Sequence, residues 1–265
     1  MIRDLQNPVV LITGASMGIG EACARAFGRR GARLILTARS AEALERVRQA
    51  VAPAEAQVLP ADLGRPEDVA ALAERALACW GRVDVLVNNA GVGIYKPCWE
   101  LEPQQARTMM EVNFFAPLEL MRRLIPPMRR QGGGTIVNVS SIAGQVALPW
   151  LTLYSASKAA LNFLADGVRI ELRGSGVRIV SVCPGFVKTG FPQHALGGQM
   201  PPALATRRRF AITAEECAEA IVRGVDRGSR TVVTPRIGWA LVWLARLFPK
   251  TLDGILARMR GPAPE

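Results

Sequence analysis

The chain has 265 residues, 49% of them hydrophobic, which is enough to bury one large α/β core without disulfides. Its formal charge of +11 is spread along the chain without interleaved aromatic residues, which argues against nucleic acid as a partner. Five scattered cysteines and one histidine provide no metal-ligand spacing, so we expect no metal site and free thiols in a reducing compartment.

Short apolar runs alternate with longer helical patterns along the chain. Strands are predicted at 8–13, 33–37, 57–60, 83–87, 135–139, 177–183 and 231–234. Helices are predicted at 18–30, 41–52, 66–80, 103–130 (bent at Pro117 or carried through it), 155–173 and 213–227, the last with Thr213 as N-cap. This order predicts a single α/β domain over residues 1–265, Rossmann-like and doubly wound, with about seven parallel strands and helices on both faces. Ligands of such sheets bind beyond the carboxyl ends of the strands.

A glycine-rich turn joins the first strand to the first helix. Its phosphate-binding candidates are Gly14, Ser16, Gly18, Ile19 and Gly20. The glycines permit a tight turn, and the helix that follows offers free N–H groups and a positive dipole end to a pyrophosphate. Glycines also serve plain turns, but a place between strand and helix favours nucleotide binding.

Tyr154 and Lys158 are four residues apart, which puts both on one face of a helix. A tyrosine has an ordinary pKa of about 10, and a nearby lysine cation favours the phenolate and lowers that value. The phenol is then able to protonate a carbonyl oxygen or to deprotonate an alcohol. Without its context, the pair is equally typical of a surface helix with a snorkelling lysine.

The Gly-x-x-x-Gly-x-Gly turn and the Tyr-x-x-x-Lys pair together resemble the short-chain dehydrogenase/reductase family over about residues 8–189. The resemblance implies a nicotinamide-dependent enzyme that reduces a carbonyl or oxidises a secondary alcohol. It implies that Ser141, thirteen residues before Tyr154, binds the substrate oxygen, while Ser140 is structural. It also implies that Asn113 completes a catalytic tetrad and holds a water near Lys158, rather than merely bending or capping its helix.

The same resemblance assigns further contacts to the cofactor, in addition to those of Tyr154 and Lys158. Asp62 and Leu63, after the third strand, are expected near the adenine, with Asp62 also capping a helix. The segment Asn89, Ala90 and Gly91 is expected to pass beside the cofactor, with asparagine side chains that tie adjacent strands together. Beyond the sixth strand, the nicotinamide carboxamide is expected to meet Pro184, Gly185, Val187 and Thr189.

The end of the second strand indicates which nicotinamide is used. A carboxylate there would repel a 2′-phosphate, but the chain has Arg39 and Ser40 instead. Arg39 is able to pair with the phosphate or stack on the adenine, and Ser40 adds a hydroxyl. These residues predict NADP(H), although Met17 stands where many NADP-binding relatives have a basic residue.

Residues 190–212 have the composition of a loop over the active site. Their apolar side chains predict a hydrophobic substrate of the lipid, steroid or acyl type, and the arginines at 207–209 suggest an anionic group as the second choice. His194 has no discernible partner and is interpreted as a surface residue. Because all four tetrad residues are present, an active enzyme is favoured over a catalytically idle NADP-binding sensor or scaffold.

The apolar extension at 236–265 is too short to span a bilayer, and the first eight residues lack a secretory signal, so we expect a cytoplasmic protein. Two interpretations of residues 236–260 stay open. They form an amphipathic helix in peripheral contact with a membrane, or they pack against the pocket or a second subunit. The resemblance implies a homodimer or homotetramer, paired through the helices that hold Asn113 and Tyr154.

Overall fold

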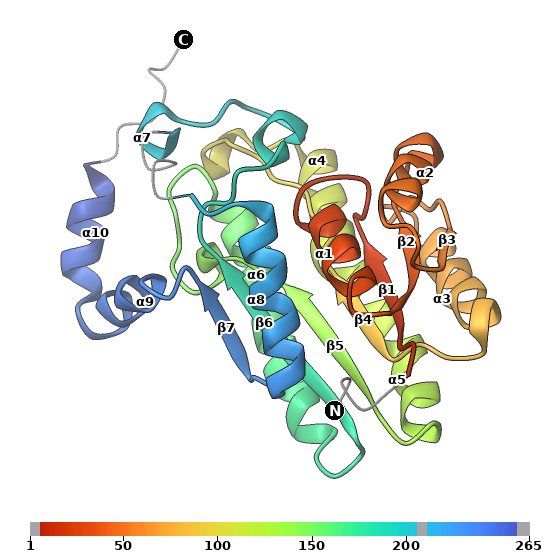
Figure 1. The fold of residues 1–265 in the computed structure, drawn as a ribbon. Helices are drawn as coiled ribbons and strands as arrows, with labels where there is room; N and C mark the ends of the chain where they lie inside the picture. The colour runs from red at the N-terminus through yellow and green to blue at the C-terminus, as the bar shows by residue number, and fades with distance from the viewer. Residues whose placement is uncertain (1–5, 206–210, 259–265) are drawn as a thin grey trace.

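The computed structural model describes residues 6–205 and 211–258. Their centre is a seven-stranded sheet of order β3-β2-β1-β4-β5-β6-β7, in which every pair of neighbours is parallel (Figure 1). The strands are β1 (Val9–Thr13), β2 (Arg33–Thr37), β3 (Ala56–Val58), β4 (Val85–Asn88), β5 (Gly134–Val139), β6 (Val177–Pro184) and β7 (Thr231–Thr234).

Helices connect these strands and extend beyond the last one. They are α1 (Gly18–Gly28), α2 (Ala41–Ala50), α3 (Pro66–Trp80), α4 (Pro103–Met110), α5 (Ala116–Arg130), α6 (Thr152–Glu171), α7 (Pro202–Ala205), α8 (Ala214–Arg227), α9 (Gly238–Leu247) and α10 (Pro249–Ala257). The prediction of a doubly wound α/β domain is therefore confirmed. Residues 206–210 of the predicted substrate loop, with its three arginines, and 259–265 of the extension lie outside the described residues.

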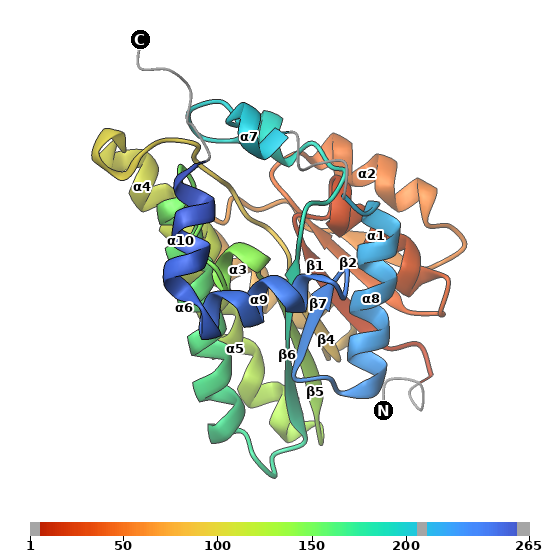
Figure 2. The same cartoon turned by 90° about the vertical axis from the view of Figure 1, so that its left-hand side faces the viewer.

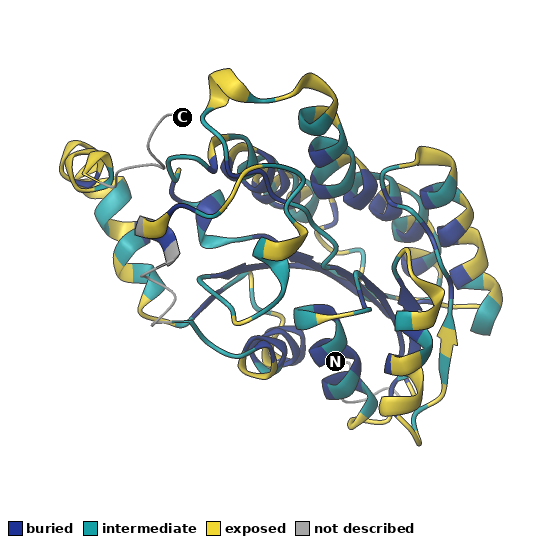
Figure 3. Cartoon of the chain, turned by 90° about the horizontal axis from the view of Figure 1, so that it is seen from above, coloured by how far each residue is buried: buried dark blue, intermediate teal, exposed yellow. Residues whose placement is uncertain are grey.

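Two hydrophobic cores flank the sheet, because alternate side chains of each strand point to opposite faces. Val10 and Ile12 of β1 contribute to the core under α1, α2 and α8. Val9 and Leu11 contribute to the core under α3, α5 and α6. Figure 2 shows α1 and α8 on one side of the strands and α5 and α6 on the other, and Figure 3 shows the buried sheet between helices whose outer surfaces are exposed.

The strand order reverses between β1 and β4, which are neighbours although they are far apart in sequence. The sequence continues to β2 on one side of β1 and to β5 on the other side of β4. This reversal leaves a crevice position at the carboxyl ends of the two strands, where doubly wound sheets bind their ligands. Both the glycine-rich turn after β1 and Asn89 after β4 lie there.

The predicted helical stretch at 103–130 is present, but its middle is a π-helix instead of an α-helix. A π-helix at Glu111–Phe115 (η3) separates α4 from α5. Pro117 lies in the first turn of α5, directly after the π-helix, so the helical stretch is carried through it. Thr213 caps α8 as predicted, and its hydroxyl forms a capping box with Glu216. Helix α6 begins at Thr152 rather than at residue 155, so Tyr154 lies in its first turn.

Candidate active site

The glycine-rich turn after β1 is held by side chains that follow β4. The Asn89 side-chain amide donates to the carbonyl oxygens of Thr13 (2.9 Å) and Gly14 (3.2 Å). The Thr13 hydroxyl accepts the backbone N–H groups of Asn89 (2.9 Å) and Ala90 (3.0 Å). A Cβ atom at Gly20 would lie 2.1 Å from the Gly14 carbonyl oxygen. Glycine is therefore required where α1 crosses the turn.

The start of α1 is shaped to receive an anion. Its N-cap, Met17, makes no side-chain hydrogen bond to the described residues, which leaves the N–H groups of the first turn free. Gly18 has a φ of +57°, which places the backbone in the left-handed region that favours glycine. The buried Thr37 hydroxyl oxygen nearby, at the end of β2, also has no hydrogen-bond partner among the described residues. These features fit a dinucleotide whose phosphates lie against the turn.

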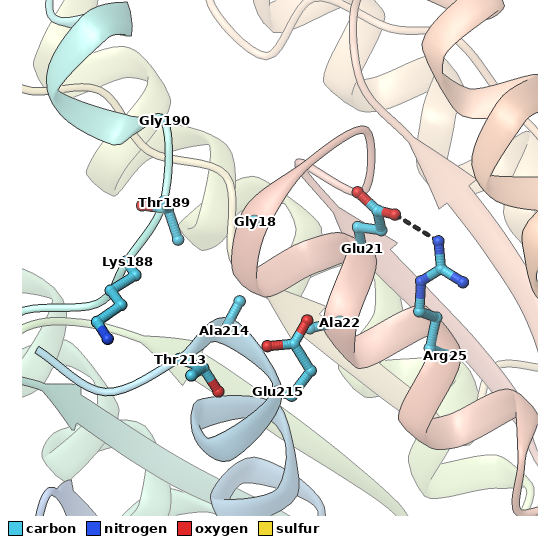
Figure 4. A pocket seen from close by; sticks show the side chains of 10 residues that line it. All are labelled: Gly18, Glu21, Ala22, Arg25, Lys188, Thr189, Gly190, Thr213, Ala214 and Glu215. Atoms are coloured by element: carbon cyan, nitrogen blue, oxygen red, sulfur yellow. Dashed lines mark hydrogen bonds and ion pairs between the residues drawn. The ribbon is translucent and has the colours of Figure 1, made fainter.

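The segment after β6 lies across this turn. A Cβ atom at Gly18 would lie 3.1 Å from the Thr189 methyl group, so the two segments are in close contact. Beside them is a cavity of about 400 Å³ between α1, residues 188–190 and the start of α8 (Figure 4). Its lining is of mixed charge, with Lys188 and the Glu21–Arg25 ion pair (2.7 Å) among the side chains. The cavity therefore adjoins the glycine-rich turn, and neither positive nor negative charge dominates its lining.

Arg39 and Ser40 occupy the end of β2 as predicted. The Arg39 side chain is exposed and makes no ion pair or hydrogen bond with the described residues, so its guanidinium is available to a ligand. The Ser40 hydroxyl caps α2 by accepting the Ala43 N–H at 3.1 Å. The Ser40 hydroxyl accepts a hydrogen bond in this cap, so its own proton remains available to donate. Arg39 and Ser40 therefore both fit a phosphate near the adenosine ribose.

Asp62 has a different local role from the predicted helix cap. The N-cap of α3 is Arg65, whereas the Asp62 carboxylate accepts the N–H of Gly64 at 3.0 Å. The Asp62 N–H donates to the Asp68 carboxylate at 3.1 Å. The result is a tight Asx turn. The short Asp62 side chain reaches the N–H two residues further on, whereas the helix begins four residues further on and is out of its reach. Leu63, the other residue expected near the adenine, is buried beside it in the core.

Tyr154 and Lys158 lie on the same face of α6, as their spacing predicts. The Lys158 ammonium lies 5.9 Å from the centroid of the Tyr154 ring and donates to the Val139 carbonyl oxygen at 3.0 Å. Only 3% of Lys158 is exposed. Burial disfavours its charged form and lowers the pKa of the ammonium to about 8.

The pKa of Tyr154 departs from the sequence-based expectation. Burial raises it above the ordinary value, and a hydrogen bond from Ser141 opposes that rise only in part. The expectation that Lys158 holds the pKa of the phenol down is not met, because both groups are buried and desolvation disfavours the charged form of each. In this structure Tyr154 is therefore a neutral phenol with a proton to give.

The two serines after β5 have separate tasks. Ser140 donates to the Lys158 carbonyl oxygen at 3.2 Å, which joins β5 to α6 and agrees with a structural role. Ser141 begins the 3-10 turn Ile142–Gly144 (η4), and its oxygen accepts the Ala143 N–H at 3.1 Å. Its hydroxyl thus stands beside the Tyr154 phenol in a fixed orientation, where a substrate oxygen would meet both.

Asn113 lies in the π-helix and is fully buried. Its side-chain oxygen accepts the Val92 N–H at 2.9 Å, and its amide donates to the Val92 carbonyl (2.9 Å) and to the Ser157 hydroxyl (3.1 Å). A Cβ atom at Gly91 would lie 3.3 Å from both the Asn113 oxygen and the Lys158 ammonium. The asparagine therefore fixes the chain beyond β4 against α6, on the side from which Lys158 approaches. Local π-helices of this kind are frequent at functional sites.

The segment after β6 is anchored by backbone bonds at both ends. The Gly185 N–H donates to the Thr234 carbonyl oxygen at 2.8 Å, and Val187 forms a parallel bridge with Ile212. The Thr189 hydroxyl accepts the N–H of Phe191 at 3.3 Å. Pro184 ends β6, so the segment predicted to meet the nicotinamide follows this strand directly and lies beside Gly18. His194 is exposed, as predicted.

An apolar cluster surrounds Tyr154 on the side of the predicted substrate loop. Its buried members are Tyr95, Leu151 and Leu204, and the partly buried residues packed on them are Leu148, Trp150, Tyr154, Phe186, Ala195, Met200 and Leu256. The Phe191 ring centroid lies 5.6 Å from that of Tyr154. Tyr95, Leu148 and Trp150 are not among the predicted site residues, although the apolar run directly before Tyr154 indicates the last two.

The substrate loop is tied to the segment that follows β4. Leu196 N–H donates to the Gly93 carbonyl (2.8 Å), and Tyr95 N–H donates to the Gly197 carbonyl (2.9 Å). The Gln105 side-chain amide adds a bond to the Leu196 carbonyl oxygen (2.9 Å). These bonds hold the loop against the segment that carries Tyr95, next to the apolar cluster.

The family described as short chain dehydrogenase matches residues 8–196. The Dehydrogenase/reductase SDR family member 7B of Bos taurus is 37% identical over 200 residues, which cover 72% of this chain and 62% of that protein. A short chain dehydrogenase/reductase of Burkholderia phymatum, solved with NAD, is 27% identical with a TM-score of 0.83 and covers 98% of both chains. A short-chain dehydrogenase of Sphingobium yanoikuyae, solved with NADPH, is 28% identical with a TM-score of 0.79 and covers 97% of this chain and 98% of that one.

Proposed function

Since the chain belongs to the short-chain dehydrogenase/reductase family, whose enzymes are NAD(P)-dependent oxidoreductases acting on CH–OH or C=O groups, we propose that it reduces a hydrophobic ketone or aldehyde with NADPH. The observation that carries the proposal is the placement of the partly buried Tyr154 phenol, which lies beside Ser141 and packs in an apolar cluster. The nicotinamide supplies the hydride when it is bound.

The residues of the chain then handle the substrate oxygen and its proton. The Ser141 hydroxyl orients the carbonyl oxygen and stabilises the negative charge that develops on it. Tyr154 gives its proton to that oxygen. Its raised pKa makes the phenol a weaker acid, but an alkoxide is a still stronger base, so the transfer remains favourable. Lys158 in its charged form steadies the phenolate that is left, and Asn113 holds the backbone around Lys158 in place.

The glycine-rich turn and the start of α1 are proposed to hold the pyrophosphate, with Gly14, Ser16, Gly18, Ile19 and Gly20 as the contacts. The adenine and its ribose are proposed to lie along Asp62, Leu63, Asn89, Ala90 and Gly91. The nicotinamide end is proposed to contact Pro184, Gly185, Val187 and Thr189. The tight packing at Gly14, Gly18 and Gly20 supports this assignment, since a Cβ atom there would collide with Ala90, Thr189 or the turn itself and change the shape of the turn.

Preference for NADP(H) is proposed from the free guanidinium of Arg39. Arg39→Asp should raise the KM for NADPH by roughly 10- to 100-fold, the effect of losing a charge-assisted hydrogen bond and adding a repulsive carboxylate, and should leave the KM for NADH almost unchanged. Steady-state kinetics with each cofactor measure this. Arg130→Asp, an exposed arginine at the end of α5, is the matched control and should change neither KM. Equal losses with both cofactors would contradict the assignment.

The activity is expected to depend on pH through Lys158. A lysine whose pKa is lowered loses its charge earlier, so kcat/KM for the cofactor, which reports on the free enzyme, should fall as pH rises through about 8. Tyr154 does not contribute to this fall, since its raised pKa keeps the phenol protonated. A profile measured from pH 6 to pH 10 tests this, and a constant value up to pH 10 would show that the Lys158 charge is not needed.

A series of methyl ketones of increasing chain length tests the substrate class. Each methylene that enters the apolar cluster should raise kcat/KM about fourfold until the cluster is filled, given about 0.8 kcal/mol for each buried methylene. A small polyhydroxylated ketone serves as the control and should be a poor substrate. Preference for the polar ketone would contradict the hydrophobic assignment, and absence of turnover on the whole panel would contradict the proposed reaction.

We also propose a homodimer or homotetramer in a reducing, cytoplasmic environment. Large apolar side chains are exposed on the helices that hold Asn113 and Tyr154, namely Phe115 (46%), Phe163 (83%) and Ile170 (72%). Such a surface is what a second subunit would cover. The five cysteines are free thiols, which agrees with a reducing compartment.

A further inference from the structure

Helices α9 and α10 meet at a sharp corner at one flank of the domain, beyond β7 (Figure 1), and this pair of helices is called the hairpin below. One side of this hairpin is packed. Val242 and Leu252 are buried in a small core with Val146, and a Cβ atom at Gly238 would lie 2.8 Å from a Val233 methyl group. The hairpin is therefore fixed to the domain, and its outer side is a surface of defined shape.

The outer side of the hairpin is apolar. Ile237 (77%), Trp243 (55%) and Leu247 (63%) are exposed, and with the exposed Ala240 they recur every three or four residues, so they lie on one face of α9. Phe248 (59%) continues this face at the corner between the helices, and Ile255 (41%) is exposed on α10. These residues are called the hairpin face below. Half of the exposed large hydrophobic side chains of the described residues belong to it.

Cations accompany the hairpin face. The exposed residues Arg236, Arg246, Lys250 and Arg258 carry positive charge on the hairpin, and Asp253 is the acidic residue within 236–258. Basic side chains beside an apolar face with exposed aromatic rings suit the boundary between anionic lipid headgroups and acyl chains. A two-fold contact between copies of the chain would instead bring the same cations together from both sides. The charge therefore favours a lipid surface over a second copy.

A cavity lies between the hairpin and the segment that precedes Tyr154. It has a volume of about 250 Å³ and lies between α10 and residues 147–152, the segment that leads into Tyr154. Leu256 of α10 lines it and also packs in the apolar cluster around Tyr154. A molecule that is held at the hairpin would thus be close to the apolar side of the catalytic phenol.

We propose that the hairpin face docks on the surface of a bilayer that contains anionic lipid. Ile237, Trp243, Leu247 and Phe248 enter the interfacial layer, while Lys250 and its neighbouring cations meet the headgroups. Among the described residues no helix combines the length and the hydropathy needed to cross a bilayer, so the contact is peripheral. Docking is independent of the catalytic step, but it would deliver lipophilic substrates to the side of the domain where the proposed site lies.

The test is co-sedimentation of the full chain with vesicles of phosphatidylcholine alone or with a third of phosphatidylglycerol. The parent protein should bind the anionic vesicles and be released by 0.5 M salt. The double variant Phe248→Ser/Lys250→Glu should bind them at least about tenfold more weakly, since a cation near an anionic surface alone accounts for roughly fivefold. The matched control is Trp99→Ser/Arg107→Glu, which changes the same kinds of exposed side chain but none of those proposed for the subunit contact.

Three results would overturn the proposal. The first is no binding of the parent to anionic vesicles, and the second is equal weakening by the test and control variants, which would indicate charge without a docking face. The third is an oligomer that the test variant dissociates while vesicle binding is unchanged, as sedimentation velocity would reveal, because the hairpin face would then cover a second copy. Turnover of a short, water-soluble ketone should be the same in the parent and the test variant. Failure of that reaction in the parent would count against the proposed function and not against docking.

Discussion

Tyr154→Phe is expected to reduce kcat for ketone reduction by about 1,000-fold, within the range of 10²- to 10⁴-fold that positioned proton transfer contributes. The substitution removes one oxygen and its proton and leaves the ring in place. The ring packs against Phe191 and the apolar cluster, so the variant should fold normally and bind the cofactor as tightly as the parent. Single-turnover kinetics with saturating NADPH measure the loss directly.

Tyr95→Phe is the matched control, since Tyr95 is the other tyrosine of the chain and is buried in the same cluster. It changes the same atom at a position that has no serine of the proposed tetrad beside it. We expect a loss of less than tenfold. A Tyr154→Phe enzyme that keeps more than a tenth of the parent's rate would show that another group donates the proton.

Gly20→Ala is expected to weaken NADPH binding by 100-fold or more. The new Cβ atom would lie 2.1 Å from the Gly14 carbonyl oxygen and 2.7 Å from the Asn89 side-chain amide. Since the first of these is a backbone atom, the turn itself must move, and with it the N–H groups proposed to bind the pyrophosphate. Loss of two such hydrogen bonds to a charged group accounts for roughly 3–6 kcal/mol, and fluorescence titration of NADPH measures the change.

The control for this substitution is Gly167→Ala, on the exposed side of α6. Outside its own helix turn, no atom of the described residues lies within 4 Å of the position of its Cβ, and alanine favours a helix over glycine by about 1 kcal/mol. Gly167→Ala should therefore keep NADPH affinity and melt at the same or a higher temperature. If Gly20→Ala melts far below the parent, binding is compared at a temperature where both are folded. Parent-like NADPH affinity in folded Gly20→Ala would rule out this turn as the phosphate site.

Much of the fold was predictable because its signals are local. The strands 33–37 and 231–234 and the helix 66–80 have their predicted bounds, since apolar β-branched runs and a proline at the first helical turn mark them clearly. Asn89 ties the ends of β1 and β4, and Asn88 donates to the Asn138 side-chain oxygen at 2.9 Å, as asparagines after a strand suggested. The order of the motifs along the chain was thus sufficient to predict that the site lies at the carboxyl ends of the strands.

The rest depends on three-dimensional surroundings that a linear pattern does not contain. Asn113 lies in a π-helix and bonds both backbone groups of Val92, a residue 21 positions away, so neither feature is visible in the local sequence pattern. Whether Lys158 or burial controls the pKa of Tyr154 depends on how much water reaches the pair. Tyr95 packs in the apolar cluster because its segment pairs with the substrate loop. No hydrophobic periodicity in the sequence predicts this pairing.

That pairing has a consequence for the timing of turnover. Residues 93–95 and 196–197 share two backbone hydrogen bonds, and Gln105 contributes a third, so a product leaving on this side must wait until they part. Loop openings of this kind occur in microseconds to milliseconds and often limit kcat in enzymes whose chemistry is fast. For an efficient substrate, loop opening would then be the rate-limiting step. The value of kcat would decrease as solvent viscosity rises, and replacing the transferred hydride with deuteride would leave kcat unchanged.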